Sequence, residues 1–389
     1  MNKLTFTRTN GNVPKTLAGK DHISGLLYYI GADELPEGFS ATNRIQLVSS
    51  IETAEKLGIK ANADAWNIRN LHHQLSQIFR INNGITLYVG LFTKPTGNFT
   101  FTEIKQMQNF AGGDIRQIAV WNGTQALVAT DVTTLQGVAT ALENEDVPLS
   151  IIYAPKVTNV SGLPSLAGSN QKNVSVVIGQ DGEGVAGELH SATDRNGATV
   201  SGVGIVLGLV SLAKVNESIA WVQKFPTGVA LPAFGDGSLY RTYDSGVIEA
   251  LDDKRYLFFL TYSGLNGSFM NDSHNLDAAT SDYNAIELVR TMDKAVRGVR
   301  TYLLPELGSP LYIDPKTGAL APETVKHLET VANYQLADMQ MAGELSGWAV
   351  EIDPDQNVLA SSTVEFVIKN VAVGVFRKGV VKIGWAQSV

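Results

Sequence analysis

The sequence contains no cysteine, so disulfide bonds and thiolate chemistry are excluded along the whole chain of 389 residues. The first ten residues, MNKLTFTRTN, lack the apolar segment of a secretory signal. The most apolar stretch, residues 203–212, is about half as long as a membrane span requires. We therefore expect a soluble protein that is made in the cytoplasm and is not inserted in a membrane.

Acidic residues are missing from both ends of the chain. Residues 1–20 and 366–389 contain no Asp or Glu, although the net charge of the whole chain is −8. Residues 21–365 therefore hold 22 basic against 38 acidic residues, a net charge of −16. Such an acidic body argues against nucleic acid as a partner. The basic residues of the two ends are Lys3, Arg8, Lys15, Lys20, Lys369, Arg377, Lys378 and Lys382.

Both ends also alternate apolar and polar residues, which is the pattern of a strand with one buried face. A basic strand at each end of an acidic body fits pairing with another copy of that body, because strand addition joins subunits through main-chain hydrogen bonds. The alternative is that the two strands edge the chain's own sheet. The apolar positions that we expect to make intermolecular contacts are Leu4, Phe6, Val381, Ile383 and Trp385.

Between the ends, predicted strands alternate with predicted helices. Amphipathic or capped helical segments separate most of the short apolar runs, and two long helices are expected at residues 281–304 and 322–342. This alternation with short connections predicts an α/β fold, a largely parallel sheet covered by helices. The expected strands are 25–30, 44–49, 85–91, 115–121, 149–153, 174–178 and 255–262.

One glycine pattern resembles a dinucleotide-binding loop. Residues 182–187 match GxGxxG and follow a predicted strand. The following residues, ELHSATDRNGATV, do not read as an amphipathic helix, and a pyrophosphate would then lack the helix N-terminus that anchors it. We expect no cofactor at this position.

The sequence offers no recognisable catalytic or metal-binding arrangement. Its six histidines have no metal-ligand spacing, and no serine lies in a GxSxG elbow. Residues 271–274 (Asn, Asp, Ser, His) gather polar groups on one loop, but a turn stabilised by Asn and Asp side chains is the simpler interpretation. We predict that the protein is not an enzyme and has no catalytic, cofactor-binding or metal-binding residues.

The first long helix carries four basic residues at intervals of four, three and three: Arg290, Lys294, Arg297 and Arg300. This spacing places them along one stripe beside the apolar face of the helix. A solvated face is the ordinary interpretation of such a run. In an acidic body, a stripe of one sign also fits a docking surface.

Several segments together resemble contractile tail sheath proteins, and especially those of Mu-like phages and related particles. The resemblance rests on ATNRIQLVSSIETAEKLGI followed by a helix and NNGITLYVGL, and on the apolar helix and Pro-Gly turn of residues 203–228. It continues through SDYNAIELVRTMDKAVRGVRTYLLP, the second long helix and the GWAVEIDPDQN turn before the terminal strands. Residues 92–101 leave no room for the protruding β-domain of larger sheaths.

The resemblance implies a layered, subtilisin-like α/β sheath core at residues 23–373, an N-terminal arm at 1–22 and a C-terminal arm strand at 374–389. It implies a subunit that polymerises with six-fold helical symmetry around a tail tube and contracts to drive the tube through a target envelope. Its partners would be copies of itself, the tail tube protein, and baseplate and terminator proteins. It would be located in the tail of a virion or phage-tail-like particle assembled in the bacterial cytoplasm.

In this interpretation the stripe of Arg290, Lys294, Arg297 and Arg300 would face the tube, although it could instead join neighbouring sheath subunits. Two other classes stay open at this point. One is another self-assembling virion or surface component, and the other is a hydrolase-like α/β enzyme, to which the fold alone would mislead. The paired terminal strands favour assembly, and the missing nucleophile and base argue against catalysis.

Overall fold

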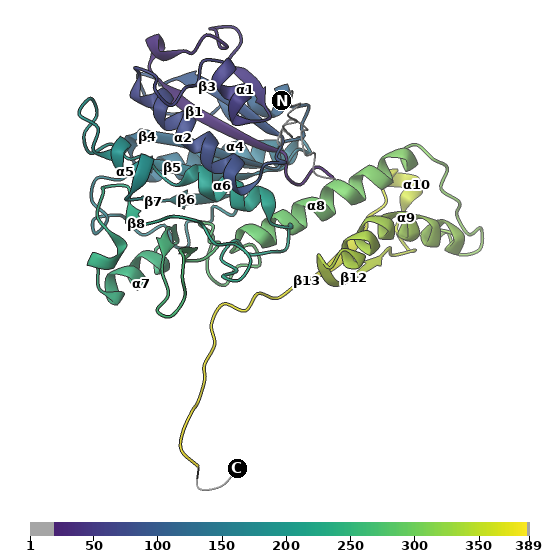
Figure 1. The fold of residues 1–389 in the computed structure, drawn as a ribbon. Coiled ribbons are helices and arrows are strands. Elements are labelled where there is room, and N and C mark those ends of the chain that lie inside the picture. Colours follow the sequence, from purple (N-terminus) through teal and green to yellow (C-terminus); the bar gives the residue numbers. More distant parts are fainter. Residues whose placement is uncertain (1–18, 387–389) are drawn as a thin grey trace, which may run out of the picture. The chain divides into compact units, whose positions relative to one another are not determined.

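The computed structural model describes residues 19–386 (Figure 1). The chain divides into two compact units, with the boundary between Arg297 and Gly298 inside a continuous helix. We call the part before this boundary unit 1 and the part after it unit 2, and we describe each by itself. The division into two arms and a core at residues 22 and 373 stays a prediction.

Unit 1 is built on one seven-stranded sheet. Its outermost strand β2 is antiparallel to β3, and the remaining neighbours are all parallel. Two antiparallel pairs lie outside this sheet: β7 (Gly179–Asp181) with β8 (Pro232–Phe234), and β10 (Phe259–Leu260) with β11 (Phe269–Met270). In spatial order the large sheet contains β2 (Ile45–Val48), β3 (Leu87–Thr93), β1 (Ser24–Ile30), β4 (Gln117–Ala126), β5 (Ser150–Lys156), β6 (Val174–Val177) and β9 (Tyr256–Leu257).

Helices cover both faces of this sheet, so the predicted α/β layering is confirmed. Helices α2 and α6 pack on one face, and α3 and α4 pack on the other. The helices of unit 1 are α1 (Ile51–Lys56), α2 (Trp66–Ile81), α3 (Glu103–Phe110), α4 (Ala129–Asn144), α5 (Gly184–His190), α6 (Val203–Leu212), α7 (Ser245–Asp253) and the first part of α8 (Ile286–Leu303), with short 3₁₀ turns at Ala32–Glu34 and Tyr240–Thr242.

Strand β1 explains why the core has two halves. All seven of its residues are buried, and alternate side chains point to opposite faces of the sheet. Leu26 and Tyr28 join the cluster on the α2 and α6 side, whereas Leu27 and Tyr29 join the cluster on the α3 and α4 side. A strand buried on both faces has the near-continuous apolar sequence that made β1 recognisable.

Two local predictions were wrong, and one helix was not predicted. The long strand expected at 255–262 is split into β9 and β10, because the Phe258 N–H is bound by the Asn271 side chain at 2.8 Å instead of by a neighbouring strand. Helix α7 had no counterpart in the sequence analysis; Asp244 caps it by accepting from the Val247 N–H. Helix α5 begins inside the glycine-rich loop, where no helix was expected.

Helices α2 and α6 contact each other at Gly204. The Gln74 side chain accepts from the Gly204 N–H at 2.9 Å and donates to the Val200 and Ser201 carbonyls at 3.0 Å. A Cβ atom at position 204 would lie 2.5 Å from the Gln74 carbonyl oxygen, which is backbone and cannot turn aside. The polar side chain of α2 therefore fixes the start of α6 only while residue 204 is a glycine.

Unit 2 contains the end of α8, α9 (Pro322–Met341) and a two-stranded antiparallel sheet of β12 (Leu345–Glu351) and β13 (Val367–Ala372). A four-residue helix, α10 (Val358–Ser361), lies in the connection between the two strands, and Leu304–Glu306 forms a 3₁₀ turn after α8. A small buried cluster of Leu320, Leu328, Ile352 and Val358 joins α9 to this connection. Pro322 opens α9 as predicted.

We predict that Gly204→Ala destabilises unit 1, because overpacking of a core contact costs about 1–3 kcal/mol and the gain in helix propensity, about 1 kcal/mol, offsets only part of that. Gly137→Ala in α4 is the matched control, because a Cβ there meets nothing within 4 Å. The control should be neutral or more stable. Urea unfolding of both variants measures the difference, and equal stabilities would contradict the contact described at Gly204.

Candidate functional site

The basic residues of α8 do not form one solvent-facing stripe. Arg290 is only 3% exposed, and its guanidinium donates to the Ala213, Lys214 and Asp21 carbonyls, each at 3.3 Å. Its charge is thus held inside unit 1, which corrects its assignment to a docking surface. Of the four predicted residues, Arg300 alone belongs to unit 2, and its side chain is exposed.

Lys294 forms an ion pair with Asp21, which lies in the turn before β1. The Nζ–Oδ2 distance is 2.7 Å, and the two side chains are 24% and 34% exposed. Burial acts to raise the pKa of Asp21, but the hydrogen bond from Lys294 and the charges of Arg290 and Arg297 outweigh it, so the pKa is lowered. Asp21 therefore stays ionised beside α8.

Arg297 and Asp293 complete the charged cluster. Burial, and to a lesser extent the neighbouring Arg116, lowers the pKa of Arg297 to about 10. Burial raises the pKa of Asp293 to about 6, against the opposing effect of Arg297. The side chains around them enclose no space for a water molecule. We call this group the α8 cluster: Asp21, Arg116, Arg290, Asp293, Lys294 and Arg297.

The sequence analysis missed the acidic members of this cluster. Asp21 is the first acidic residue after a start that has none, and Asp293 lies within one helical turn of both Arg290 and Arg297. Both signals were readable, because residues three and four apart share a helix face. The basic spacing was correctly recognised, but it gave no information on what the stripe packs against.

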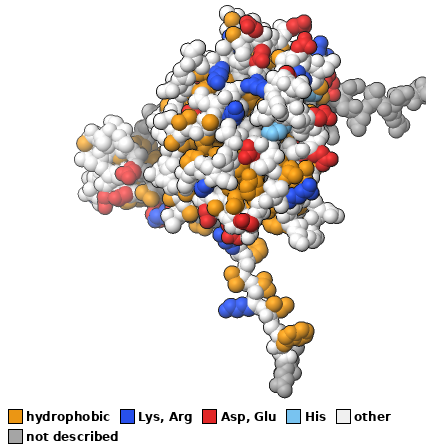
Figure 2. Space-filling model, turned by 90° about the vertical axis from the view of Figure 1, so that its left-hand side faces the viewer, with side chains coloured by type: hydrophobic (Ala, Val, Ile, Leu, Met, Phe, Trp, Pro, Cys, Tyr) orange, Lys and Arg blue, Asp and Glu red, His pale blue; other side chains and the backbone are white. Residues whose placement is uncertain are grey.

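The C-terminal segment, residues 373–386, forms no strand within the described part of the chain. Three of its apolar side chains are almost fully exposed: Val381 at 85%, Ile383 at 95% and Trp385 at 106%. Figure 2 shows hydrophobic and basic side chains along this segment. Leu4 and Phe6 lie outside the described residues, so the role of both ends in intermolecular contacts stays a prediction.

Residues 271–274 do not assemble a nucleophile and a base. The Ser273 hydroxyl is fully buried and donates to Glu287 at 2.7 Å, whereas the His274 ring contacts the Asp252 carboxylate at 3.0 Å. In a serine nucleophile that is activated by histidine, the serine hydroxyl is hydrogen-bonded to the histidine ring. This loop is held as a structural turn, with Asn271 bonded to the Tyr256 carbonyl at 2.9 Å.

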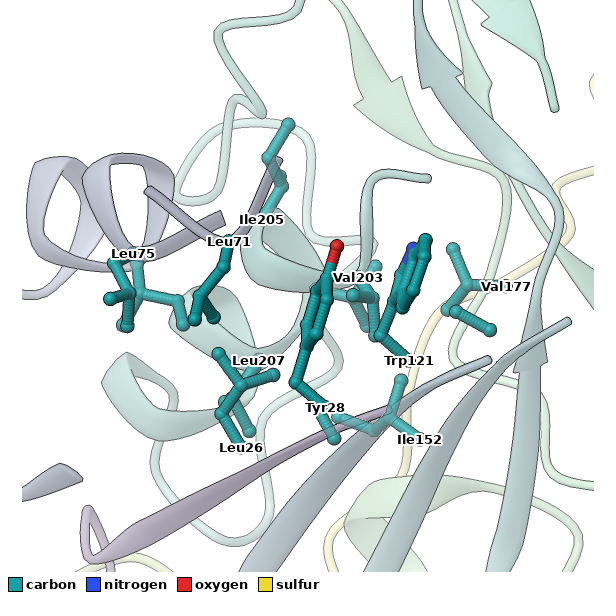
Figure 3. Close-up of a cluster of buried hydrophobic side chains, with 14 of the residues drawn as sticks. Leu26, Tyr28, Leu71, Leu75, Trp121, Ile152, Val177, Val203, Ile205 and Leu207 are labelled. Atoms are coloured by element: carbon teal, nitrogen blue, oxygen red, sulfur yellow. The ribbon is translucent and has the colours of Figure 1, made fainter. Parts of the chain in front are cut away.

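The crevice in which open α/β sheets bind ligands lies at the carboxyl ends of the strands, where the strand order reverses. Here β1 has β3 on one side and β4 on the other. Tyr28 of β1 and Trp121 of β4 stack with ring centroids 4.2 Å apart on the α2 and α6 side of the sheet (Figure 3). The ring of Trp66 lies 6.1 Å from that of Trp121. The Trp121 indole donates to the Val200 carbonyl at 3.2 Å, and the Tyr28 and Trp121 rings are fully buried, so they belong to the hydrophobic core beside this point.

The glycine-rich loop at 182–187 also fits no phosphate. Helix α5 is only seven residues long, and the carboxylates of Glu183 and Glu188 line the hollow beside it. These charges would repel a pyrophosphate. Among the described residues, no group of three or more His, Asp or Glu could hold a metal ion. In that same part of the chain, no helix is long and apolar enough to cross a membrane.

The fold is similar to that of chains from contractile injection systems. The chain matches a chain of the anti-feeding prophage (AFP) baseplate with a TM-score of 0.65 at 13% identity, over 100% of this chain and 99% of that one. It also matches a chain of the contracted sheath complex of PVC, an extracellular contractile injection system, with a TM-score of 0.63 at 11% identity, over 100% of this chain and 98% of the other. The resemblance predicted from the sequence is thus confirmed at the level of the fold.

The chain belongs to the DUF2586 family. Residues 3–274 match its N-terminal domain and residues 282–388 match its C-terminal domain. No curated protein matches the sequence.

We predict that Lys294→Ala destabilises unit 1 by about 1–3 kcal/mol, because it leaves the partly buried Asp21 carboxylate without its partner. Lys105→Ala is the matched control. It removes an ion pair with Glu145 whose side chains are 47% and 45% exposed, so its expected effect is only about 0–1 kcal/mol. Urea unfolding of both variants tests the difference. Losses of the same small size would show that the α8 cluster does not hold the start of β1.

The buried Asp293 carboxyl predicts a stability contribution that falls as the pH rises from about 4 to about 6. A carboxyl whose pKa is raised in the folded state stabilises the fold below its unfolded pKa, and this contribution is lost as the pH rises through the folded pKa. The pKa of Asp293 is raised from 3.8 to about 6.

Asp293→Asn should remove this slope, which amounts to about 1.4 kcal/mol for each pKa unit. The measurement is the free energy of urea unfolding of both proteins across that pH range. Asp253→Asn at the exposed end of α7 serves as the control. The control should keep the slope, and a slope that persists unchanged in Asp293→Asn would contradict the assignment.

Proposed function

We propose that this chain is a subunit of a contractile tail sheath, a structural protein that polymerises helically around a tail tube and contracts to drive the tube through a target envelope. The observation that carries the proposal is the exposed, alternating C-terminal segment of residues 373–386. It belongs to a chain whose fold matches, over its full length, chains from two contractile injection systems.

In this proposal the C-terminal segment joins neighbouring subunits. An exposed strand with one apolar face is completed by main-chain hydrogen bonds to a sheet edge in a neighbouring copy. A head-to-tail contact that repeats without closing generates a helix of subunits. Gly374 and Gly379 lie in the segment and give its backbone the freedom to follow a subunit that moves. Contraction is then a rearrangement of packed bodies during which the strand connections persist.

The proposal extends to partners and location. The partners are further copies of the chain in a six-fold helical sheath, the tail tube protein, and the baseplate and terminator proteins at the two ends. The particle is a virion tail or a phage-tail-like particle assembled in the bacterial cytoplasm. For the tube contact, Arg300 is the candidate that remains exposed, whereas Arg290, Lys294 and Arg297 contribute to the α8 cluster.

The proposal assigns no enzymatic role and no cofactor. Its support is the geometry of the two places where chemistry was conceivable: the Ser273 hydroxyl is buried and donates to Glu287, and Glu183 and Glu188 line the hollow beside the glycine-rich loop. A second structural role is favoured by one observation, because one similar chain comes from a baseplate. A baseplate-type component would form closed rings in place of long tubes.

We predict that deletion of residues 374–389 leaves a folded protein that cannot form tubes. Each lost main-chain hydrogen bond contributes only about 0.5–1.5 kcal/mol, but the loss repeats at every subunit contact. Electron microscopy of the purified proteins shows tubes or their absence, and circular dichroism checks the fold.

A finer variant changes Val381, Ile383 and Trp385 to Ser, and Val380→Ser on the opposite face of the segment is its control. The triple variant should lose tubes and the control should keep them. Normal tubes from the truncated protein would contradict the proposal. A truncated protein that does not fold would instead place the segment in the chain's own fold.

A further inference from the structure

Five asparagines of the chain are followed directly by a glycine. In such a pair the backbone nitrogen of the glycine can attack the side-chain amide of the asparagine, because glycine has no Cβ atom to hinder the approach. The two groups must meet in one particular geometry, so a fold that fixes either of them prevents the attack. Asn10 lies outside the described residues, and the other four are Asn83, Asn122, Asn196 and Asn266.

Two of these pairs are held by side-chain hydrogen bonds. After Asn83, the Gly84 N–H donates to the side-chain oxygen of Asn82 at 3.2 Å. Asn122 is fully buried in β4, and its amide donates to the Tyr153 hydroxyl at 3.2 Å. In the first pair the nitrogen is engaged, and in the second the side chain cannot turn towards it.

The pair at Asn196 is exposed, but its nitrogen is also engaged. The Gly197 N–H donates to the carbonyl of His190, the last residue of α5, at 2.8 Å. The nitrogen must lose its proton before it attacks, and a hydrogen bond to a carbonyl holds that proton in place. This pair is therefore protected although water reaches it.

The two Asp-Gly pairs of the chain, which can close the same ring, follow this pattern. They lie at 181–182 and 236–237. In each pair the glycine N–H donates to a backbone carbonyl at 2.8 Å, that of Leu231 in the first and that of Phe234 in the second. The fold thus engages the nitrogen at each of these positions.

Asn266 and Gly267 differ from all these pairs. They lie in the connection between β10 and β11, in a run of seven exposed residues, 261–267. Within the part of the chain that the structure describes, neither the Asn266 side chain nor the Gly267 N–H forms a hydrogen bond. Order begins again at Ser268, which is 1% exposed and whose hydroxyl donates to the Val229 carbonyl at 2.7 Å.

We propose that Asn266 is a site of spontaneous deamidation, and that the fold leaves it the most reactive of the four described Asn-Gly pairs. This inference goes beyond the proposed function and does not rest on it. Exposed loop positions with small and polar residues are where covalent change concentrates in folded proteins.

The reaction needs only water. The Gly267 nitrogen loses its proton to water or hydroxide and bonds to Cγ of Asn266, and Nδ2 takes up a proton and leaves as ammonia. Water then adds to one of the two carbonyl carbons of the resulting five-membered imide, and the bond from that carbon to the ring nitrogen breaks. Opening at Cγ gives aspartate, whereas opening at the main-chain carbonyl gives isoaspartate. One water is consumed and one ammonia is released.

The product changes this surface of unit 1. Either form carries a carboxylate, so the chain becomes one charge more negative than its original −8. Isoaspartate also lengthens the main chain by one carbon, beside the exposed side chain of Leu265. Because Ser268 is held by Val229, we expect the change to stay within the loop.

Incubation of the full-length protein at neutral and mildly alkaline pH tests the proposal. Proteolysis and fragment mass spectra locate deamidation at each asparagine over time. We expect it at Asn266 at least several-fold faster than at Asn83, Asn122 and Asn196, and faster at the higher pH. The control is the same protein unfolded in guanidinium chloride, in which the four pairs should react at similar rates. Equal rates in the folded protein, or protection of Asn266 as strong as that of the other three, would overturn the proposal.

A variant checks the site by its product. Asn266→Gln would need to close a six-membered ring, which forms much more slowly, so isoaspartate detected by enzymatic methylation should fall to background. Asn196→Gln is the matched control in another exposed loop and should keep the signal. The urea midpoint of both variants should equal that of the unchanged protein. A methylation signal that persists in Asn266→Gln would show that the reactive site lies elsewhere.

Discussion

The ion pair between Lys294 and Asp21 joins two parts of the chain that are 273 residues apart. Asp21 precedes the central strand β1, and Lys294 lies in the helix that continues into unit 2. Arg290 reinforces the connection through the Asp21 carbonyl, to which Gln117 at the start of β4 also donates. The beginning of the sheet and the beginning of α8 are thereby held by one set of charges.

These charges are expensive to bury, and their arrangement explains why they persist. Asp21 keeps a lowered pKa because cations surround it, whereas Asp293 has a raised pKa because burial dominates. The Asp293 carboxyl within α8 and the Asp21 carboxyl that pairs with α8 therefore have pKa values shifted in opposite directions. Ion pairs and hydrogen bonds are directional, so the α8 cluster restricts the position of the first part of α8 within unit 1 more than apolar packing alone would.

Much of the α/β core was predictable because its signals are local. Apolar runs such as 25–30 and 174–178 are buried on both faces in β1 and β6, and Pro322 begins α9 as its missing N–H predicts. The failures depend on partners distant in sequence. The Asn271 side chain separates β9 from β10, and Asp21 pairs with Lys294 of α8. The periodicity within either segment gives no information about these partners.

The two candidate sites at residues 271–274 and 182–187 also depended on contacts that the sequence does not show. Residues 271–274 were interpreted as a turn stabilised by Asn and Asp side chains, and the structure adds that Glu287 accepts a hydrogen bond from the Ser273 hydroxyl. The glycine pattern at 182–187 does open a helix, contrary to expectation, but a short one flanked by Glu183 and Glu188. Residue types were readable from the sequence, whereas the direction of each side chain was a property of the packed fold.

The exposed C-terminal segment carries a hazard as well as a use. Apolar, β-prone residues such as Val380, Val381 and Ile383 could stack with their own counterparts into aggregates, because identical exposed strands pair readily. Lys378 precedes these residues and Lys382 lies between Val381 and Ile383, and charges at such positions oppose aggregation. Two such segments repel each other, so at the high local concentration of newly made protein these lysines keep the segments of different copies apart.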